Sequence, residues 1–451
     1  MFTGPFQQIP LDGGSTADLF LLRYDEHGRL RSPATEQILK HELADVSDVF
    51  LFSHGWNNTF AKALDRYLNF ATGYIEQRRL FGIGTAAAYR PVLVGVMWPS
   101  ISFLMSWEQG PKIAAPPNPD GPEAAEAEEL FTYVTDSLDP AADAEFTDLV
   151  DGRGAVDADQ ARRAAQIVLD ALRSTSDQDD GAPPPSVEEF LDAWAQIDSG
   201  EVIAPADPNV FGTVGQRPDP GIRAAAGFSF DPRDLLRAAT VWKMKARSGV
   251  VGANGVGRLV RHVLQDTNAR LHLIGHSFGA RVVLSALASF APDRPAHSML
   301  LLQPAVNRWC FAQDVAGTGR VGGYFPVLER VRQPILTTFS EYDEPLTKFF
   351  HLAVRGGSLG EPDIAAFGDP ELYGALGGFG PAGLGDLCES EAAAVPGEQG
   401  YDLHGGRRVI AVDGGVLVAD GDGGDKPAID GHGDVSNPTT WWALHCLTGA
   451  D

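Results

Sequence analysis

The sequence predicts an α/β fold built on a mostly parallel central sheet, and two features of its apolar pattern lead to this prediction. Short apolar segments of strand length recur along the chain, and several are apolar at every position, as strands covered by helices on both faces must be. Segments with apolar residues three and four positions apart, typical of helices, lie between them. Strands that alternate with helices need crossover connections, which produce parallel strands.

Seven segments are expected to form the strands: Leu19–Tyr24, Asp48–Ser53, Pro91–Met97, Leu271–Gly275, Ser298–Leu302, Pro334–Phe339 and Arg408–Val412. Helices are expected over Asn58–Leu80, Gly252–Leu264, Phe278–Phe290 and Thr439–Leu447. A Gly-rich stretch from Gly356 to Gly406 is expected to form long loops with one short helix.

The alternation breaks once, and this divides the chain into three parts. Residues 1–99 and 234–451 are expected to form the two parts of the core, and residues 100–233 an acidic, mainly helical insertion. Lys112–Asp198 within it carries 21 Asp and Glu against 5 Lys and Arg, a net charge of −16 out of −25 for the chain. The insertion is either a solvated surface or a lid over a pocket. Its expected helices are Glu123–Leu138, Asp157–Arg173 and Ser186–Ile197.

Composition excludes several classes of function for these 451 residues. A net charge of −25 disfavours nucleic acid and anionic membranes as partners, since both require a basic surface. The sequence has no run of 18 apolar residues, so no transmembrane helix is expected. The N-terminus lacks the pattern of a signal peptide. Three cysteines cannot build a disulfide framework. A soluble, cytoplasmic protein is expected, and the sequence predicts no oligomeric state.

The strongest chemical motif is Gly275-His-Ser277-Phe-Gly279, which lies between an expected strand and an expected helix. A serine between two glycines at such a turn is the signature of a nucleophile elbow. The turn is so tight that side chains two positions before and after the serine would clash. Ser277 is therefore the predicted nucleophile. It stands at a helix N-terminus, which favours a developing negative charge.

A second motif, His54-Gly-Trp56-Asn57-Asn58, follows the expected strand Asp48–Ser53. An oxyanion hole needs two backbone N–H donors. Phe278, directly after the nucleophile, is expected to supply one, and Trp56 the other. The alternative is an ordinary strand-to-helix loop in which Asn57 or Asn58 caps the helix.

A serine nucleophile needs a base and an acid that orients it, in the chain order Ser, Asp or Glu, His. The acid should follow a strand, and Asp343 is the first choice, with Glu341 and Glu344 as alternatives. Among the downstream histidines, His432 lies in a Gly-rich loop and is the predicted base; the others are His351, His404 and His445. Asp434 is expected either to cap the last helix or to form a nearby hydrogen bond.

Two weaker motifs are set aside. Asp420-Gly-Asp422-Gly-Gly-Asp425 resembles a calcium loop but lacks the downstream Glu of an EF-hand. Gly252-Ala-Asn-Gly-Val-Gly lacks the preceding strand of a dinucleotide site. Neither a metal nor an organic cofactor is expected.

These motifs together resemble those of bacterial α/β-hydrolase-fold proteins of unknown function. The resemblance lies in His54-Gly-Trp-Asn-Asn, then Trp98-Pro-Ser100 after the next strand, then Gly275-His-Ser277-Phe-Gly, and it covers residues 15–100 and 235–440. It implies an α/β-hydrolase fold, a Ser-Asp-His triad and esterase- or lipase-like activity. The chain departs from compact members in its insertion and in the Gly-rich region before His432.

The sequence therefore predicts a serine hydrolase that cleaves a carboxylic ester in a small-molecule substrate through an acyl-enzyme. Thioester and amide hydrolysis and acyl transfer use the same residues and stay open. A non-catalytic interaction module on a hydrolase scaffold is the alternative of a different class.

Overall fold

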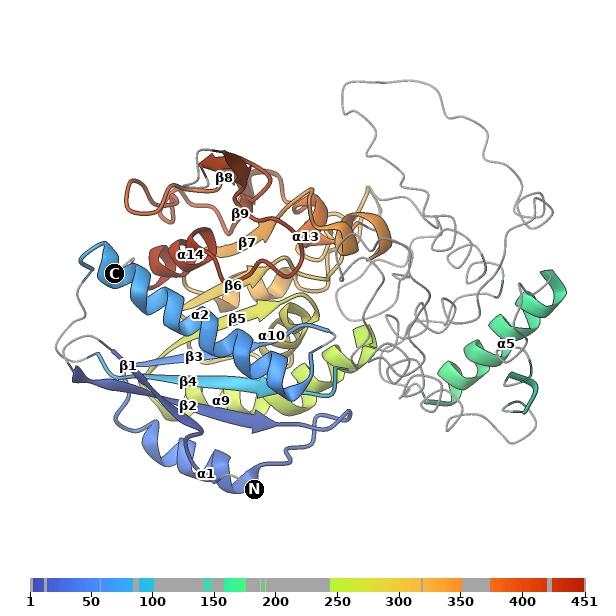
Figure 1. Ribbon diagram of the computed structural model, residues 1–451, viewed down its shortest axis with the longest axis horizontal. Coiled ribbons are helices and arrows are strands. Elements are labelled where there is room, and N and C mark those ends of the chain that lie inside the picture. The colour runs from blue at the N-terminus through green and yellow to red at the C-terminus, as the bar shows by residue number, and fades with distance from the viewer. Residues whose placement is uncertain are drawn as a thin grey trace.

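The structure is a computed structural model. It describes residues 3–11, 14–56, 58–83, 89–100, 158–175, 244–317, 319–350, 374–419 and 424–449, with isolated positions between 142 and 191. Figure 1 shows these parts as coloured ribbon.

A nine-stranded, mostly parallel sheet forms the centre of the fold, in the order β1-β2-β4-β3-β5-β6-β7-β9-β8. Of its pairings only β1–β2 is antiparallel. The strands are β1 Gln7–Pro10, β2 Thr16–Arg23, β3 Asp48–Ser53, β4 Pro91–Met97, β5 Arg270–His276, β6 Ser298–Leu302, β7 Ile335–Phe339, β8 Cys388–Ala392 and β9 Val409–Asp413. A small hairpin, β10 Leu417–Ala419 with β11 Asp425–Pro427, stands apart from the sheet.

Helices cover both faces of the sheet. The longer elements are α1 Pro33–Glu42, α2 Phe60–Leu80, α9 Gly257–Asp266, α10 Phe278–Ala288 and α14 Pro438–Thr448. The shorter ones are the π-helical turns η2 Val251–Val256 and η4 Pro345–Phe349, the 3₁₀ turns η3 Phe325–Arg330 and η5 Gly385–Leu387, and α13 Leu376–Phe379. In Figure 1, α2 crosses in front of the strands.

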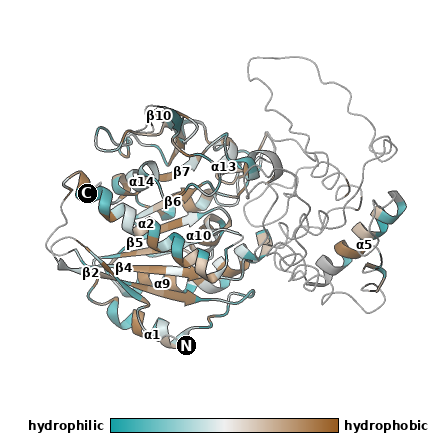
Figure 2. Ribbon diagram, viewed as in Figure 1, coloured by the Kyte–Doolittle hydropathy of each residue, from teal (hydrophilic) through white to brown (hydrophobic). Residues whose placement is uncertain are grey.

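Alternate residues along a strand enter different cores, because successive side chains point to opposite faces. In β2, Phe20 and Leu22 join one buried cluster with residues of α1, α9 and α10, while Leu19 and Leu21 join a second cluster with residues of α2 and α14. Figure 2 shows the central strands coloured mainly as hydrophobic. This explains why the expected strands are apolar at nearly every position.

The prediction of an α/β fold with a mostly parallel sheet is confirmed, and all seven expected strands are present. β1, β8 and the β10–β11 hairpin were not predicted. β8, in the Gly-rich stretch expected to hold only loops and one short helix, has the sequence CESEA and lies at the sheet edge. An edge strand with polar, partly exposed residues leaves no apolar signal to read. The expected short helix there is α13.

The expected helix Asp157–Arg173 is present as α5, Ala158–Thr175. Of the other two helices expected in the insertion, Glu123–Leu138 lies outside the described residues, and Ser186–Ile197 is described only at Val187 and Leu191, both helical. Residues 351–373, in the region around Gly356–Gly406, also lie outside the described residues. Whether the insertion forms a lid is therefore still a prediction. Among the helices of the described part of the chain, none is both long and apolar enough to cross a membrane.

Candidate active site

The predicted nucleophile lies between β5 and α10. β5 ends at His276 and α10 begins at Phe278, so Ser277 alone joins strand to helix. Its backbone has φ 55° and ψ −126°, a combination that residues with a side chain rarely adopt. Ser277 N–H donates to Leu302 O, and Ala305 N–H donates to Ser277 O, each at 3.1 Å. These bonds hold the strained turn against the end of β6.

The glycines on either side of the serine are required by two separate close approaches. A β-carbon on Gly275 would lie 2.5 Å from Cα of Ala280, and one on Gly279 would lie 2.1 Å from the carbonyl oxygen of Ser53. Both neighbours are backbone atoms, which cannot move aside as a flexible side chain could. The expected steric need for small residues two positions before and after the serine therefore has a structural cause on each side.

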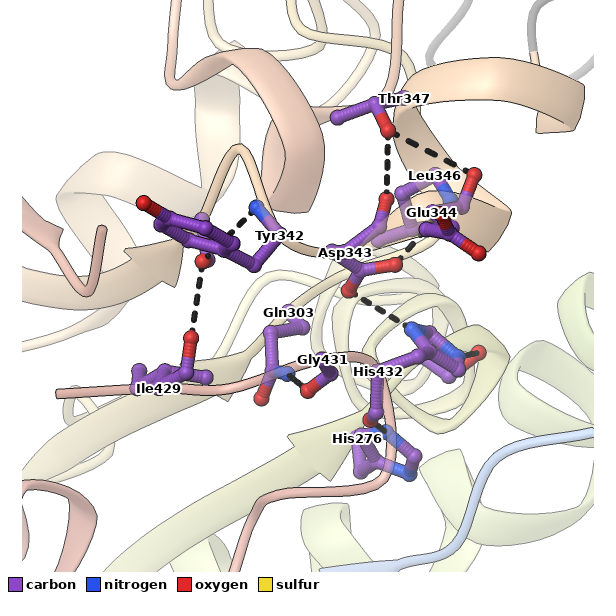
Figure 3. Close-up of polar contacts among 12 residues, drawn as sticks. His276, Gln303, Tyr342, Asp343, Glu344, Leu346, Thr347, Ile429, Gly431 and His432 are labelled. Carbon is purple, nitrogen blue, oxygen red and sulfur yellow. Dashed lines mark hydrogen bonds and ion pairs between the residues drawn. The ribbon is translucent and has the colours of Figure 1, made fainter. Parts of the chain in front are cut away.

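Ser277, His432 and Asp343, which we call the candidate triad, are joined by hydrogen bonds. His432 Nε2 lies 2.9 Å from Ser277 Oγ, and His432 Nδ1 lies 2.8 Å from Asp343 Oδ2. Because a carboxylate only accepts hydrogen bonds, Nδ1 carries the proton and Nε2 accepts from the serine hydroxyl. Figure 3 shows the Asp343 carboxylate pointing at the His432 ring. Such an arrangement can take a proton from Ser277 while the carboxylate holds the ring.

Asp343 is the one of the three acidic candidates that reaches the histidine. Its carboxylate is fully buried and also accepts a hydrogen bond from the backbone N–H of Leu346 at 3.1 Å. Its own carbonyl accepts from the Thr347 hydroxyl at 2.8 Å, which fixes the turn after β7. Glu341 and Glu344 are exposed residues of the same turn.

His432 lies in the loop between β11 and α14, and its side chain is 18% exposed. The other downstream histidines lie elsewhere: His404 is exposed in a turn, and His445 packs on α14 against Trp442 with ring centroids 4.8 Å apart. His351 lies outside the described residues. Only His432 among the described candidates meets Ser277.

Asp434 closes the loop and does not cap the last helix. Its carboxylate accepts from the backbone N–H of Asp430 at 3.0 Å, which bridges the two sides of the loop that carries His432. α14 is capped by Asn437, which forms a capping box with Thr440.

Of the two expected oxyanion donors, Phe278 directly follows Ser277 and Trp56 belongs to the loop after β3, which touches Ser277. Phe278 is the first residue of α10, and the N–H groups of a helix's first turn have no partner within the helix. A β-carbon on Gly55 would lie 2.5 Å from Ser277 Cβ, so the loop after β3 touches the nucleophile directly. Trp56 follows Gly55 and packs against the core.

Side chains from the motifs at His54 and at Trp98 hold this loop in place. The His54 ring stacks on Trp98 with centroids 5.6 Å apart and an interplanar angle of 9°. Trp98 Nε1–H donates to His54 O at 2.9 Å, and His54 Nδ1–H donates to Gly55 O at 2.8 Å. Burial lowers the pKa of His54 to about 4, so the ring stays neutral and keeps both contacts.

Asn58 and Ser100 brace the same loop. Asn58 Nδ2 donates to the carbonyls of Gly55 at 3.1 Å and Trp56 at 2.8 Å, and the Ser100 hydroxyl donates to Asn58 O at 3.1 Å. The alternative role of Asn58 as helix cap is wrong, because α2 is capped by Thr59. Asn57 lies outside the described residues.

The sequence analysis did not single out two further side chains that support the loop of His432. Gln303 Nε2 donates to Gly431 O at 2.5 Å, and His276 Nε2 lies 2.9 Å from His432 O, as Figure 3 shows. Gln303 directly follows the expected strand Ser298–Leu302. It lies at the carboxyl ends of the parallel strands, as Ser277 does. Position after a strand was thus a signal that could have found it.

In the described part of the chain, no three or more His, Cys, Asp or Glu side chains gather as a metal site would require. Asp425, the last acidic residue of the calcium-like segment, begins β11, whereas Asp420 and Asp422 lie outside the described residues.

We compared the chain with protein-family models, with curated proteins and with solved structures, and none of the three comparisons found a match. What the protein does must therefore be inferred from the geometry of these residues.

Proposed function

We propose that this protein is a serine hydrolase of the α/β-hydrolase fold that cleaves a carboxylic ester through an acyl-enzyme. One observation carries the proposal: the unbroken hydrogen-bond chain from Ser277 through His432 to Asp343, with the serine at a strained turn between strand and helix. The mostly parallel sheet flanked by helices is compatible with this fold.

In the first half of the reaction, Ser277 Oγ attacks the carbonyl carbon of the ester while its proton passes to His432 Nε2. Buried Asp343 holds the Nδ1–H and stabilises the imidazolium that forms. His432 then gives the proton to the departing alkoxide, which leaves as an alcohol as the acyl-serine forms. In the second half, water takes the place of the alcohol and attacks the acyl carbon while His432 takes its proton. His432 then returns this proton to Ser277 Oγ as the acyl–oxygen bond breaks and the carboxylic acid is released.

The negative charge of the tetrahedral intermediate needs donors that are already in position. In our proposal these are the N–H groups of Phe278, at the start of α10, and of Trp56, in the loop that touches Ser277. The stacked His54–Trp98 pair and the amide of Asn58 keep that loop from moving, so little reorganisation is needed when charge develops.

The same residues could hydrolyse a thioester or an amide, or transfer the acyl group to an alcohol instead of water. A non-catalytic interaction module on this scaffold is the competing class of function. What weighs against such a module is the strained Ser277 backbone, which costs about 1–3 kcal/mol and is of the kind that clusters at active sites.

A fluorophosphonate probe tests the proposal directly, because it labels serines that a neighbouring base activates. We expect the wild-type protein to be labelled and Ser277→Ala to remain unlabelled. Folding of both proteins is checked by circular dichroism. A folded wild-type protein that takes no label would reject the enzymatic proposal.

p-Nitrophenyl esters of increasing acyl length then define the substrate. Hydrolysis by the wild-type protein, lost in His432→Ala, would support the ester assignment and the base together. Full activity of His432→Ala would reject His432 as the base. Parallel assays with thioester, anilide and alcohol acceptors separate the chemistries that share the triad.

A further inference from the structure

His276 precedes the nucleophile, yet its side chain is directed at the base. The residue is only 2% exposed, and its Nε2 lies 2.9 Å from the carbonyl oxygen of His432. On the other side of the ring, Nδ1 lies 3.0 Å from Nη1 of Arg66, which projects from α2. One imidazole thus connects the helix that covers the sheet to the loop that carries the base.

The chemistry of the two partners fixes the tautomer of this ring. A guanidinium only donates hydrogen bonds, so Nδ1 of His276 must be the unprotonated nitrogen that accepts from Arg66. A backbone carbonyl only accepts, so Nε2 must carry the hydrogen that is donated to His432. Both partners demand the same neutral Nε2–H form.

We propose that Arg66 and His276 are positioning residues for the base: Arg66 holds His276 as the Nε2–H tautomer, and His276 holds the backbone of His432 so that its ring meets Ser277. This inference rests on the proposed function. It assigns neither residue to proton transfer. His432 remains the only base, and the contact to it from His276 is made through the backbone.

A second buried donor acts on the neighbouring peptide group. Gln303, fully buried after β6, donates its amide N–H to Gly431 O at 2.5 Å. Gly431 has φ 98°, a conformation that favours glycine, so the loop bends sharply just before the base. Two consecutive carbonyl groups are therefore held by residues at the carboxyl ends of β5 and β6, the strands that also hold the Ser277 turn.

The electrostatic setting keeps His276 neutral. Burial lowers its pKa well below the ordinary value, and the positive charge of Arg66 lowers it further. The charged or titratable groups that face it are Arg66 from α2, His432 from the base loop and His54 from the loop after β3. A proton on Nδ1 would point at the guanidinium and break the chain of contacts.

The test uses two amides that differ in reach. Gln in place of His276 puts an N–H donor near the position of Nε2, whereas Asn resembles the Nδ1 edge of the ring and falls short of His432 O. We expect His276→Asn to lower kcat for p-nitrophenyl ester hydrolysis about 100-fold, since displacing a catalytic group by about 1 Å has this effect. KM should stay within about twofold, because substrate contacts are intact.

His276→Gln should recover at least about tenfold of that loss, since it restores the donor. A purely structural role for His276 would lower the melting temperature of both variants alike, with no gap between their kcat values. Equal kcat for Asn, Gln and wild type would overturn the proposal. Arg66→Lys, which keeps one donor, and Arg66→Met, which keeps none, form a second matched pair with the same expected order.

A readout that does not need activity separates this inference from the proposed function. In ¹⁵N-histidine-labelled wild-type protein, the ring of His276 should give the nitrogen shifts of a neutral Nε2–H imidazole near neutral pH. Arg66→Met should raise the share of the Nδ1–H tautomer, because one of the two partners that demand the Nε2–H form is gone. Observing the Nδ1–H form in the wild type would refute the tautomer lock, even if the esterase assays succeed. Observing Nε2–H while those assays fail would refute only the enzymatic function.

Discussion

Two hydrogen-bonded sets of Asp, His and Ser lie at opposite ends of the central strands. The candidate triad lies at the carboxyl ends. The second set, which we call the buried trio, consists of Asp48, His272 and Ser298 near the amino ends of β3, β5 and β6. In the trio, His272 Nε2 lies 3.0 Å from Asp48 Oδ1 and His272 Nδ1 lies 2.8 Å from Ser298 Oγ. By distance alone the two sets are equivalent.

The two sets differ in exposure to solvent, in the backbone strain at the serine and in the partners of the aspartate. All three residues of the buried trio are at most 1% exposed, and Phe50 stacks on His272 with centroids 4.5 Å apart. Ser298 begins a regular strand, with no strained backbone and no helix starting behind it. Asp48 is engaged by two further donors, the Ser47 hydroxyl at 2.6 Å and Arg270 Nε at 2.7 Å. The trio therefore joins three strands and offers no route for a substrate.

Residue type and hydrogen-bond distance therefore do not by themselves make a catalytic site. What marks the candidate triad is a serine at a strained turn, a helix N-terminus directly after it, and a histidine on a loop with a partly exposed ring. The buried trio uses the same hydrogen-bonding groups for stability.

The two serines provide the largest contrast. Ser277→Ala should reduce ester hydrolysis about 10⁴-fold or more, since the nucleophile acts as one unit with the base. Ser298→Ala, the matched control, should keep the rate within about twofold, because it lies outside the proposed site. Initial rates on a p-nitrophenyl ester measure both. Comparable losses of activity in the two variants would contradict the different roles of the candidate triad and the buried trio.

The two aspartates should separate activity from stability. Asp343→Asn is expected to lower kcat about 10⁴-fold by changing the tautomer of His432. Asp48→Asn should keep its activity per folded molecule and lower the free energy of unfolding by about 1.5–3 kcal/mol, because the hydrogen bonds of Arg270 and His272 to a buried carboxylate are weakened. Urea denaturation and active-site titration measure the two effects. A stable, inactive Asp48→Asn would contradict the structural role of the trio.

Close backbone approach is a further property of the candidate site. Gly279→Ala would put a β-carbon 2.1 Å from Ser53 O, at the end of β3, and should cost about 3 kcal/mol of stability and much of the activity. Gly400→Ala is the control, since its β-carbon would be 3.5 Å from Cys446 Sγ, an ordinary contact. Thermal unfolding and ester hydrolysis of both variants test this; a tolerated Gly279→Ala would show that the loop after β3 can move.

Acid titration of stability gives the smallest effect. Burial opposes the charged form of Asp48, yet hydrogen bonds from His272, Ser47 and Arg270 outweigh it and lower the pKa from 3.8 to about 2. The unfolded chain then binds the proton first as pH falls, so stability present above about pH 4 is lost on the way to about pH 2. The loss due to this group should be about 2 kcal/mol.

Urea unfolding of the wild-type protein and Asp48→Asn across this range measures that contribution as the difference between the two pH profiles. The asparagine variant should show the shallower loss. Parallel profiles would mean that the pKa of Asp48 is the same in the folded and the unfolded protein, and that its hydrogen bonds do not stabilise the charged carboxylate.

Most of the sheet could be predicted from the sequence, because strands buried on both faces leave continuous apolar segments such as Asp48–Ser53. The polar edge strand β8 could not, since its partly exposed side chains carry no such pattern. The alternative role of Asn58 as cap of α2 was wrong because several polar residues precede the helix, and only the backbone shows that Thr59 is the one in position.

For the candidate site, chain order and local context were enough to select Ser277, Asp343 and His432, although these residues are far apart in sequence. The supporting residues were not accessible in the same way. Arg66 lies in the middle of an amphipathic helix, and its contact with His276 spans 210 positions. No local pattern distinguishes it from any other arginine on a helix surface.

The sequence by itself determined the strands and the strained turn at Ser277, because both depend on local preferences: apolar runs for burial and glycines for close approach. Only the tertiary structure showed that Asp48, His272 and Ser298 meet as a second Asp-His-Ser set, buried among the strands, because their contact depends on how distant strands pair. It also decided the tautomer of His276, because that depends on which atoms of distant residues meet its two ring nitrogens.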